Sequence, residues 1–255
     1  MDYRSQLAVY TDAIKDFCKS NNYSHTVEAT FESLNDWSIF YNLEEVKSWF
    51  LAKRENSTLS VENIPLNQIT DWTVDAETGN VSHKSGDFFV IHGVRVSSQS
   101  RERGVGWDQP ILTQVGYDGG VLGIVRKRFD GIPHYLCEAK EEPGNYGKVQ
   151  ISPTLQATFA NIAQSHGGRR PHFVDLFLNA SDDSSIKILF DSWLAEDGGR
   201  LHLKRNRGML IELSEVHNIE LPNDNFVWLS LYQIKQLLRE DAWINPHIRG
   251  ILAHV

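Results

Sequence analysis

The chain has 255 residues, 41% of them hydrophobic, which is enough to bury one sizeable core, so we expect one main domain. Its formal net charge of −8 argues against a broad nucleic-acid-binding or anionic-membrane-binding face, because both need clustered Lys and Arg. The two cysteines, Cys18 and Cys137, form neither a disulfide framework nor a zinc motif, and no signal-peptide core or membrane-length apolar run is present. We therefore expect a soluble, cytoplasmic protein.

The N-terminal part is predicted to be helical. Apolar residues at helical spacing predict a helix from residue 3 to about 19, ended by Asn21-Asn22. A second helix is expected over Leu43–Lys53, with Asn42 as its cap. We treat residues 1–60 as a helical segment packed on a main domain of residues 61–255.

The rest of the chain is rich in β-forming residues and turn signals. The predicted strands are Phe88–Val96, Ile111–Val115, Val121–Phe129, His134–Ala139, Ile186–Phe190, Leu201–Leu203, Met209–Leu213 and Asn225–Leu229. Tyr117–Gly120 and Asp130-Gly131 are hairpin signals, because Asp and Gly tolerate positive φ. Ser230 and Gln233 predict a capping box, and Asn245-Pro246 begins a last short helix. The pattern predicts an α+β fold with a mixed, largely antiparallel sheet and flanking helices.

Two short basic runs interrupt these predicted strands. They are Arg126–Arg128 and Lys204–Arg207. We expect both to be solvated strand ends or turns.

The block Gly104–Pro110 predicts a ligand-contacting loop, because two glycines and a proline flank polar and aromatic side chains. Trp107 can stack on a nucleotide base or serve as a core aromatic. Asp108 and Gln109 can contact a ligand or satisfy a turn and the backbone.

A second block, Glu141–Asn145, follows the end of a predicted strand. If the strand alternation continues, Lys140 and Glu142 share a face. Such a pair can lower the lysine pKa or hold the carboxylate ready as a base, or it can be an exposed ion pair.

Two further blocks carry neutral and basic ligand-binding groups. In Ser152–Thr158 the alternation places Thr154, Gln156 and Thr158 on one surface of a strand, facing sugar hydroxyls or solvent. Glu196–Arg200 predicts a hairpin turn, after which the planar fork of Arg200 can meet a diphosphate. At the final helix Asn245, His247 and Arg249 can present an anion site or form an ordinary capped surface helix.

In this order, the four blocks resemble the NDP-hexose 2,3-dehydratases of deoxysugar biosynthesis. The similarity extends from about Trp37 to the C-terminus and includes Ser85–Phe89 and Phe226–Leu229. The resemblance implies a Nudix-like fold that removes water across C2 and C3 of a nucleotide-linked 4-keto-6-deoxyhexose, typically the dTDP form, without metal or redox cofactor. It also implies two such modules in tandem, whereas this sequence holds one, so we expect a homodimer.

The resemblance and the chemistry together suggest roles for single residues. We expect Lys140 or Glu142 to transfer the C3 proton, Gln109 and Gln156 to contact the enolate or hydroxyls, and Trp107 to hold the base. Arg200 or Arg249 would bind the diphosphate. The other expected substrate contacts are Asp108, Asn145, Thr154, Thr158 and Asn245.

Other functions are weaker on sequence grounds. No His or Cys motif has metal-ligand spacing, and no nucleophile elbow, P-loop or dinucleotide fingerprint is present. A non-catalytic nucleotide-sugar binding or regulatory module of the same fold is the main alternative. A Nudix-type pyrophosphohydrolase is the third, but the Glu-rich metal-binding helix that it needs is missing.

Overall fold

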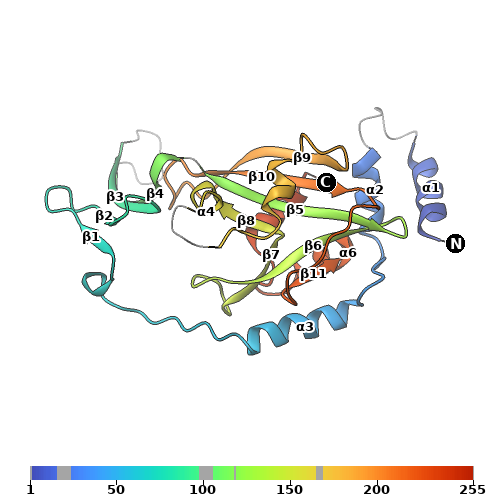
Figure 1. Cartoon of the computed structure of the whole chain (residues 1–255), viewed down its shortest axis with the longest axis horizontal. Coiled ribbons are helices and arrows are strands. Elements are labelled where there is room, and N and C mark those ends of the chain that lie inside the picture. The colour runs from blue at the N-terminus through green and yellow to red at the C-terminus, as the bar shows by residue number, and fades with distance from the viewer. Residues whose placement is uncertain (1, 16–23, 98–105, 118, 165–168, 255) are drawn as a thin grey trace.

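The computed structural model describes residues 2–15, 24–97, 106–117, 119–164 and 169–254. A seven-stranded sheet lies in the middle of the molecule, with a four-stranded sheet at one end and the first two helices at the other (Figure 1). The predicted α+β class, with largely antiparallel pairing and flanking helices, is confirmed. None of the described helices is both long and apolar enough to cross a bilayer.

Three helices precede the sheets. Helix α1 (Tyr3–Ile14) is capped by Asp2, and the expected helix end near residues 19–22 lies outside the described residues. Helix α3 (Leu43–Glu55) has the predicted Asn42 cap, completed into a capping box by Glu45. Helix α2 (Ser24–Glu32) was not predicted, because the side that it buries carries carboxylates as well as apolar groups.

The four-stranded sheet is an antiparallel ladder in chain order. Its strands are β1 (Trp72–Val74), β2 (Val81–His83), β3 (Phe89–Val96) and β4 (Trp107–Gln114). The prediction of a loop around Trp107 is wrong, since β4 begins there and pairs with β3 along its whole length; Gly104 of that block lies outside the described residues. Pro110 fits because β4 is an edge strand of its sheet, where a missing N–H is tolerated.

The seven-stranded sheet is antiparallel except for the parallel pair β5 and β10. Its members are β5 (Gly120–Phe129), β6 (Ile132–Glu141), β7 (Val149–Pro153), β8 (Leu155–Thr158), β9 (Ile186–Ala195), β10 (Arg205–Leu213) and β11 (Phe226–Leu229). The hairpin at Asp130-Gly131 is confirmed, with φ of 52° and 80°.

Two turn and strand predictions were wrong. The expected hairpin at Tyr117–Gly120 is absent, because the strands before and after it, β4 and β5, belong to different sheets. Turn residues permit a chain reversal, but they do not decide which strands pair. Leu201–Leu203 is not a strand: Leu201 makes one isolated bridge with Leu112, and Leu203 has a φ of 54° and is exposed.

The main sheet splits where β5 and β6 diverge, and β7 and β8 fill the gap. The last pair before the split is Val125 with Leu136; beyond it β6 pairs with β7, and β5 pairs with β8. The Thr154 hydroxyl closes the apex of the split by accepting from the Val125 N–H at 2.9 Å and donating to the Leu136 carbonyl at 2.5 Å. The expected shared strand face holds for Gln156 and Thr158 of β8 but not for Thr154, because the chain turns at Thr154.

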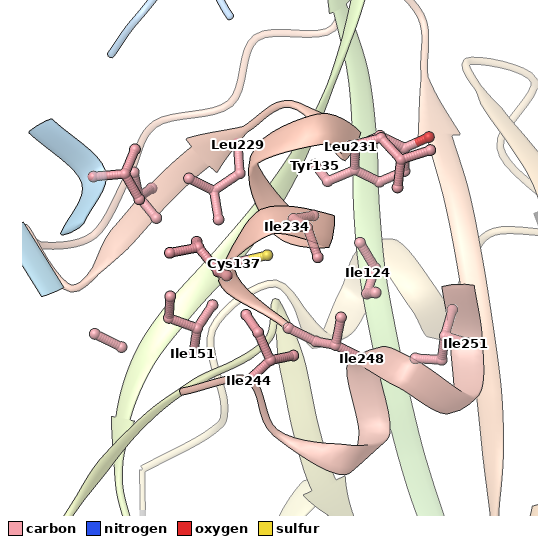
Figure 2. Close-up of a cluster of buried hydrophobic side chains, with 14 of the residues drawn as sticks. Ile124, Tyr135, Cys137, Ile151, Leu229, Leu231, Ile234, Ile244, Ile248 and Ile251 are labelled. Carbon is pink, nitrogen blue, oxygen red and sulfur yellow. The ribbon is translucent and has the colours of Figure 1, made fainter. Parts of the chain in front are cut away.

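Helices cover both faces of the main sheet. On one face α3, α6 (Leu231–Leu237) and α7 (Pro246–Leu252) pack on the sheet, and α7 begins at Pro246 after the Asn245 cap, as predicted. Figure 2 shows Ile234, Ile248 and Ile251 from these helices directed at Ile124 of the sheet. The other face is covered by α5 (Val174–Leu178) and the short α4 (Phe159–Ile162). Each fully buried apolar side chain contributes about 1.5–3 kcal/mol.

The first basic run is largely buried, contrary to the prediction, whereas in the second run Asn206 is buried and Arg205 is exposed. Arg126 is 3% exposed and binds Glu28 and Glu32 of α2 and Glu212 of β10. Lys127 is also buried, and Lys204 is half-buried. The prediction failed because the acidic partners that compensate these charges come from distant parts of the chain.

Candidate active site

Three of the four residues predicted to be catalytic lie together at the open end of the split. Gln156 of β8 donates from Nε2 to Oε1 of Glu142 at 2.8 Å. Lys140, near the end of β6, donates from Nζ to the Gln156 carbonyl at 3.4 Å. The predicted shared site of Lys140 and Glu142 is thus present, and the partner that joins them is Gln156.

A second set of polar groups approaches from α7 and the β9–β10 connection. His247 Nδ1 lies 3.6 Å from Oε1 of Glu196, and the same oxygen accepts from Asn206 Nδ2 at 2.5 Å. Lys204 donates from Nζ to Oε1 of Gln114 at the end of β4. We call these residues, with Glu138 and the Lys140, Glu142 and Gln156 group, the polar cluster.

The polar cluster is a half-buried site with altered proton affinities. Burial lowers the pKa of His247, while the negative charges of Glu196 and Glu142 oppose that shift and the positive charges of Lys204 and Lys140 add to it. Burial also raises the pKa of Glu138, and the charge of Lys140, 3.9 Å away, partly offsets this rise. Because both predicted residues influence His247, the two sets of groups act as one electrostatic unit.

One atom of the polar cluster is left without a partner. Oε1 of Gln156 is buried and accepts no hydrogen bond within the described part of the chain. A buried acceptor without a donor is costly, so such an atom is suited to receive a ligand hydroxyl.

A separate pocket of about 710 Å³ lies between β3, β4 and the 196–202 connection. Trp107 and Gln109 line it, and their side chains are joined by a 2.8 Å hydrogen bond from Nε1 to Oε1. Gln109 also donates to the Gly199 carbonyl at 2.9 Å. The structure therefore separates Gln109 from the other predicted catalytic residues and places it beside Trp107.

The pocket and the polar cluster share strand β4. Gln109 lies in the pocket, whereas Gln114, five residues further, contacts Lys204 of the polar cluster. At the usual strand rise the two glutamines are about 16 Å apart along β4.

The remaining predicted residues have structural partners. Asp108 pairs with Arg95 at 2.8 Å, both side chains being exposed, and Arg200 pairs with Asp197 in the exposed turn. Asn145 donates to the Lys140 carbonyl at 3.2 Å and so holds the end of β6. Thr158 caps α4, Asn245 caps α7, and Arg249 is exposed in the last turn of α7. The Thr154 hydroxyl is buried and makes two hydrogen bonds inside the sheet, so its contact with a substrate stays a prediction.

Sequence reasoning missed Glu138, Glu196, Lys204 and Asn206 and treated His247 only as part of an anion site. The period-two spacing of Glu138, Lys140 and Glu142 was an available signal. The others required knowledge that the β9–β10 connection and α7 meet the split in the sheet. Among the described residues no three His, Cys, Asp or Glu side chains come together as a metal-binding group.

Residues 43–255 match the family of NDP-hexose 2,3-dehydratases. The chain belongs to this family. A dTDP-4-dehydro-6-deoxy-alpha-D-glucopyranose 2,3-dehydratase from Amycolatopsis orientalis is 37% identical over 214 residues, which cover 82% of this chain and 44% of that protein. One from Saccharopolyspora spinosa is 35% identical over 234 residues, covering 92% of this chain and 46% of that protein. This NDP-hexose 2,3-dehydratase family member thus spans less than half the length of these relatives.

Solved structures with a detectable likeness are more distant. An Ap4A hydrolase from C. elegans is 12% identical, with a TM-score of 0.31, over 52% of this chain and 92% of that one. An ADP compounds hydrolase is 9% identical, with a TM-score of 0.36, over 77% and 94%. These likenesses are slight, and the fold class of the family member rests on the elements described above.

Proposed function

We propose that this chain is a nucleotide-sugar 2,3-dehydratase that removes water across C2 and C3 of a dTDP-linked 4-keto-6-deoxyhexose. Its relatives with 35–37% identity are named for this reaction. The observation that carries the proposal is the polar cluster, in which Lys140, Glu142 and the unpartnered Gln156 amide oxygen meet.

The reaction needs groups of the kind that the polar cluster offers. The C4 ketone acidifies the C3 proton, so a base removes it, donors stabilise the enolate oxygen, and an acid assists the departing C2 hydroxyl. Glu142 and Lys140 are the candidates for taking the C3 proton. Gln156 Oε1 is placed to accept a hydrogen bond from a sugar hydroxyl.

The nucleotide would occupy the pocket beside β4. Trp107 offers a ring for stacking on the base, and Gln109 offers an amide already oriented by Gly199. Arg200, after leaving its pair with Asp197, or the exposed Arg249 on α7 would bind the diphosphate. Four further residues would support these contacts by holding the elements around the site. They are Asp108 on β4, Asn145 at the end of β6, Asn245 at the start of α7 and Thr158 at the start of α4.

We also propose that two copies associate, because the relatives are about twice as long as the matched region. In this arrangement residues 1–60 form a helical segment on the module of residues 61–255, and the protein works in the cytoplasm. Light scattering at micromolar concentration should give twice the chain mass. A monomer under those conditions would argue against the dimer and leave the catalytic proposal intact.

Mass spectrometry of the purified protein with dTDP-4-keto-6-deoxyglucose, in the presence of a chelator, tests the reaction. Loss of one water from the nucleotide sugar is expected. Calorimetric binding of the same nucleotide sugar without water loss would instead support the non-catalytic binding module. Magnesium-dependent release of a nucleoside monophosphate would support hydrolysis and contradict the proposal.

A further inference from the structure

The proposed dehydration requires two proton transfers at different atoms. One group takes the proton from C3, and a group on the other side of the reacting bond protonates the C2 oxygen as it leaves. Glu142 and Lys140 lie at the end of β6 and are the candidates for taking the C3 proton. The inference below rests on the proposed function and assigns the other side.

The sheet register places a second group across from Gln156. Gln156, Leu122 and Gly208 are aligned across β8, β5 and β10, and Asn206 lies two residues before Gly208. Since side chains alternate, Asn206 shares with Gln156 the sheet face on which α7 packs. At the usual strand spacings the backbones of Gln156 and Asn206 are about 12 Å apart, which leaves room for a small ring between their side chains.

His247 is held firmly at the Asn206 side of this gap. Its backbone N–H donates to the Asn245 cap at 2.9 Å, and the Asn245 N–H donates to the Ile151 carbonyl of β7 at 2.9 Å. The next residue, Ile248, is completely buried in the core. The backbone that carries the imidazole is therefore fixed relative to the sheet.

The ring of His247 has one nitrogen engaged and one available. Nδ1 faces Glu196, whose carboxylate is itself oriented by Asn206. No hydrogen bond to Nε2 is found within the described part of the chain. A carboxylate behind one ring nitrogen fixes the orientation of the imidazole and stabilises its protonated form, which leaves Nε2 as the proton-donating atom.

The proton affinity of His247 suits a donor. Burial lowers its pKa, so the imidazolium gives up its proton more readily than an exposed histidine does. Glu196 and Glu142 counteract the shift, whereas Lys204 and Lys140 strengthen it, so the charged groups that act on His247 come from the end of β6 and from the β9–β10 connection.

We propose that His247 is a second catalytic residue of the dehydration, which protonates the departing C2 hydroxyl from Nε2, and that Glu196 is its positioning residue. The C3–H bond breaks and its proton goes to the base; its electron pair passes through the enolate into the C2–C3 double bond. The C2–O bond then breaks, the oxygen keeps the electron pair of the C2–O bond and takes the proton from His247, and water leaves. The proton on the base is returned to His247 through solvent, so no other reactant is consumed.

The test separates the two proton transfers in D2O. Wild-type protein and the variants His247→Gln and Glu196→Gln are incubated with dTDP-4-keto-6-deoxyglucose, and mass spectrometry follows both water loss and deuterium entry at C3. His247→Gln should lower the rate of water loss about 100-fold or more while deuterium still enters the remaining substrate, because the base is intact. Glu196→Gln should show the same pattern with a loss of about tenfold, since the imidazole remains but is no longer oriented.

A matched control is His254→Gln, which replaces the histidine stacked on Phe190 near the end of the chain. It should retain both reactions, and retained exchange in His247→Gln reports directly that the variant is folded. Water loss at the wild-type rate in His247→Gln contradicts the role of His247, and so does loss of exchange together with water loss in a variant whose thermal unfolding is unchanged. A wild-type protein that neither exchanges nor loses water contradicts the proposed function itself.

Discussion

Two groups of charged side chains lie on the main sheet, and they differ in how closely opposite charges meet. The Arg126 network contains Arg126, Arg128, Glu28, Glu32 and Glu212, and Arg126 lies 3.0 Å from Glu28 and 2.6 Å from Glu32. The polar cluster also has three glutamates and two lysines, but its charges stand further apart, at 3.9 Å for Lys140 with Glu138 and 3.6 Å for His247 with Glu196.

The difference separates a structural role from a functional one. In the Arg126 network the charges are nearly fully buried and compensate one another directly, with Tyr135 completing the contacts of Glu32 at 3.0 Å. In the polar cluster the opposite charges are further apart, and the Gln156 amide oxygen has no donor among the described residues. A closed network fixes α2 on the sheet, whereas an open one leaves interactions available to a ligand.

The largest expected effect on stability comes from Arg126→Leu. Glu32 would remain buried without a cation, and Glu28 and Glu212 would keep only Arg128, so the free energy of unfolding should fall by about 3–5 kcal/mol. Urea denaturation measures it. The matched variant Arg207→Leu, which breaks the more exposed pair with Asp191, should lose under about 1 kcal/mol. Equal losses in the two variants would contradict the structural role of the network.

In the polar cluster, Gln156→Leu should affect turnover more than stability. Removing the open amide oxygen and the bond to Glu142 should lower kcat/KM about 10–100-fold, as expected for lost hydrogen bonds to a charged group or ligand. Steady-state kinetics with the dTDP sugar measures it. Gln150→Leu on the adjacent β7 should leave kcat/KM unchanged; if both variants lose equally, Gln156 has no specific role.

Acid pH should weaken the Arg126 network as Glu28 takes up a proton. Burial would raise the pKa of Glu28, but the hydrogen bond from Arg128 and the charge of Arg126 outweigh it and lower the pKa from 4.5 to about 2. The stabilisation is therefore complete above pH 4.5 and is lost as the pH falls towards 2, up to about 3 kcal/mol. Chemical denaturation of wild type and Glu28→Gln across this range should show the pH dependence reduced in the variant; parallel curves would contradict this assignment.

The polar cluster should show a pH dependence of its own. Because the imidazolium is the proposed acid and burial lowers the pKa of His247, the ratio of water loss to C3 exchange should fall as the pH rises past that pKa. Measuring both rates between pH 5 and pH 8 tests the sign. A ratio that rises with pH would point to neutral His247 acting as a base.

The smallest effect is expected from Asp108→Asn. The Arg95–Asp108 pair is exposed on both sides, so its loss should leave the thermal midpoint and kcat unchanged. Differential scanning fluorimetry and the turnover assay check this. A clear rise in KM would restore Asp108 to the substrate-binding groups.

The sequence predicted much of the fold where local patterns decide it. The Asn42 and Ser230 capping boxes, the Asp130-Gly131 hairpin and most strands of the main sheet follow from short-range signals. Thr154 could not be placed, because its role depends on two other strands that separate beside it. Helix α2 was not predicted for the same reason. Its buried glutamates are compensated by Arg126, which lies far along the chain.

The candidate site divides in the same way. The alternation of Lys140 and Glu142 is a property of one strand and was predicted, and Gln156 joins them across the split. The contribution of His247 and Glu196 arises only when α7 and the β9–β10 connection meet. Residues that are neighbours through topology leave no spacing signal in a single sequence.

The central claim is that the polar cluster performs the dehydration, and one experiment tests it most directly. Wild type and Glu142→Gln, both folded by circular dichroism, are incubated with dTDP-4-keto-6-deoxyglucose and a chelator, and mass spectrometry records the nucleotide sugar. A product lighter by one water is expected with wild type, and water loss at least about tenfold slower is expected with Glu142→Gln, which removes either the base itself or the carboxylate that holds Gln156. Equal water loss by both proteins, or none by a wild type that binds the nucleotide sugar, would contradict it.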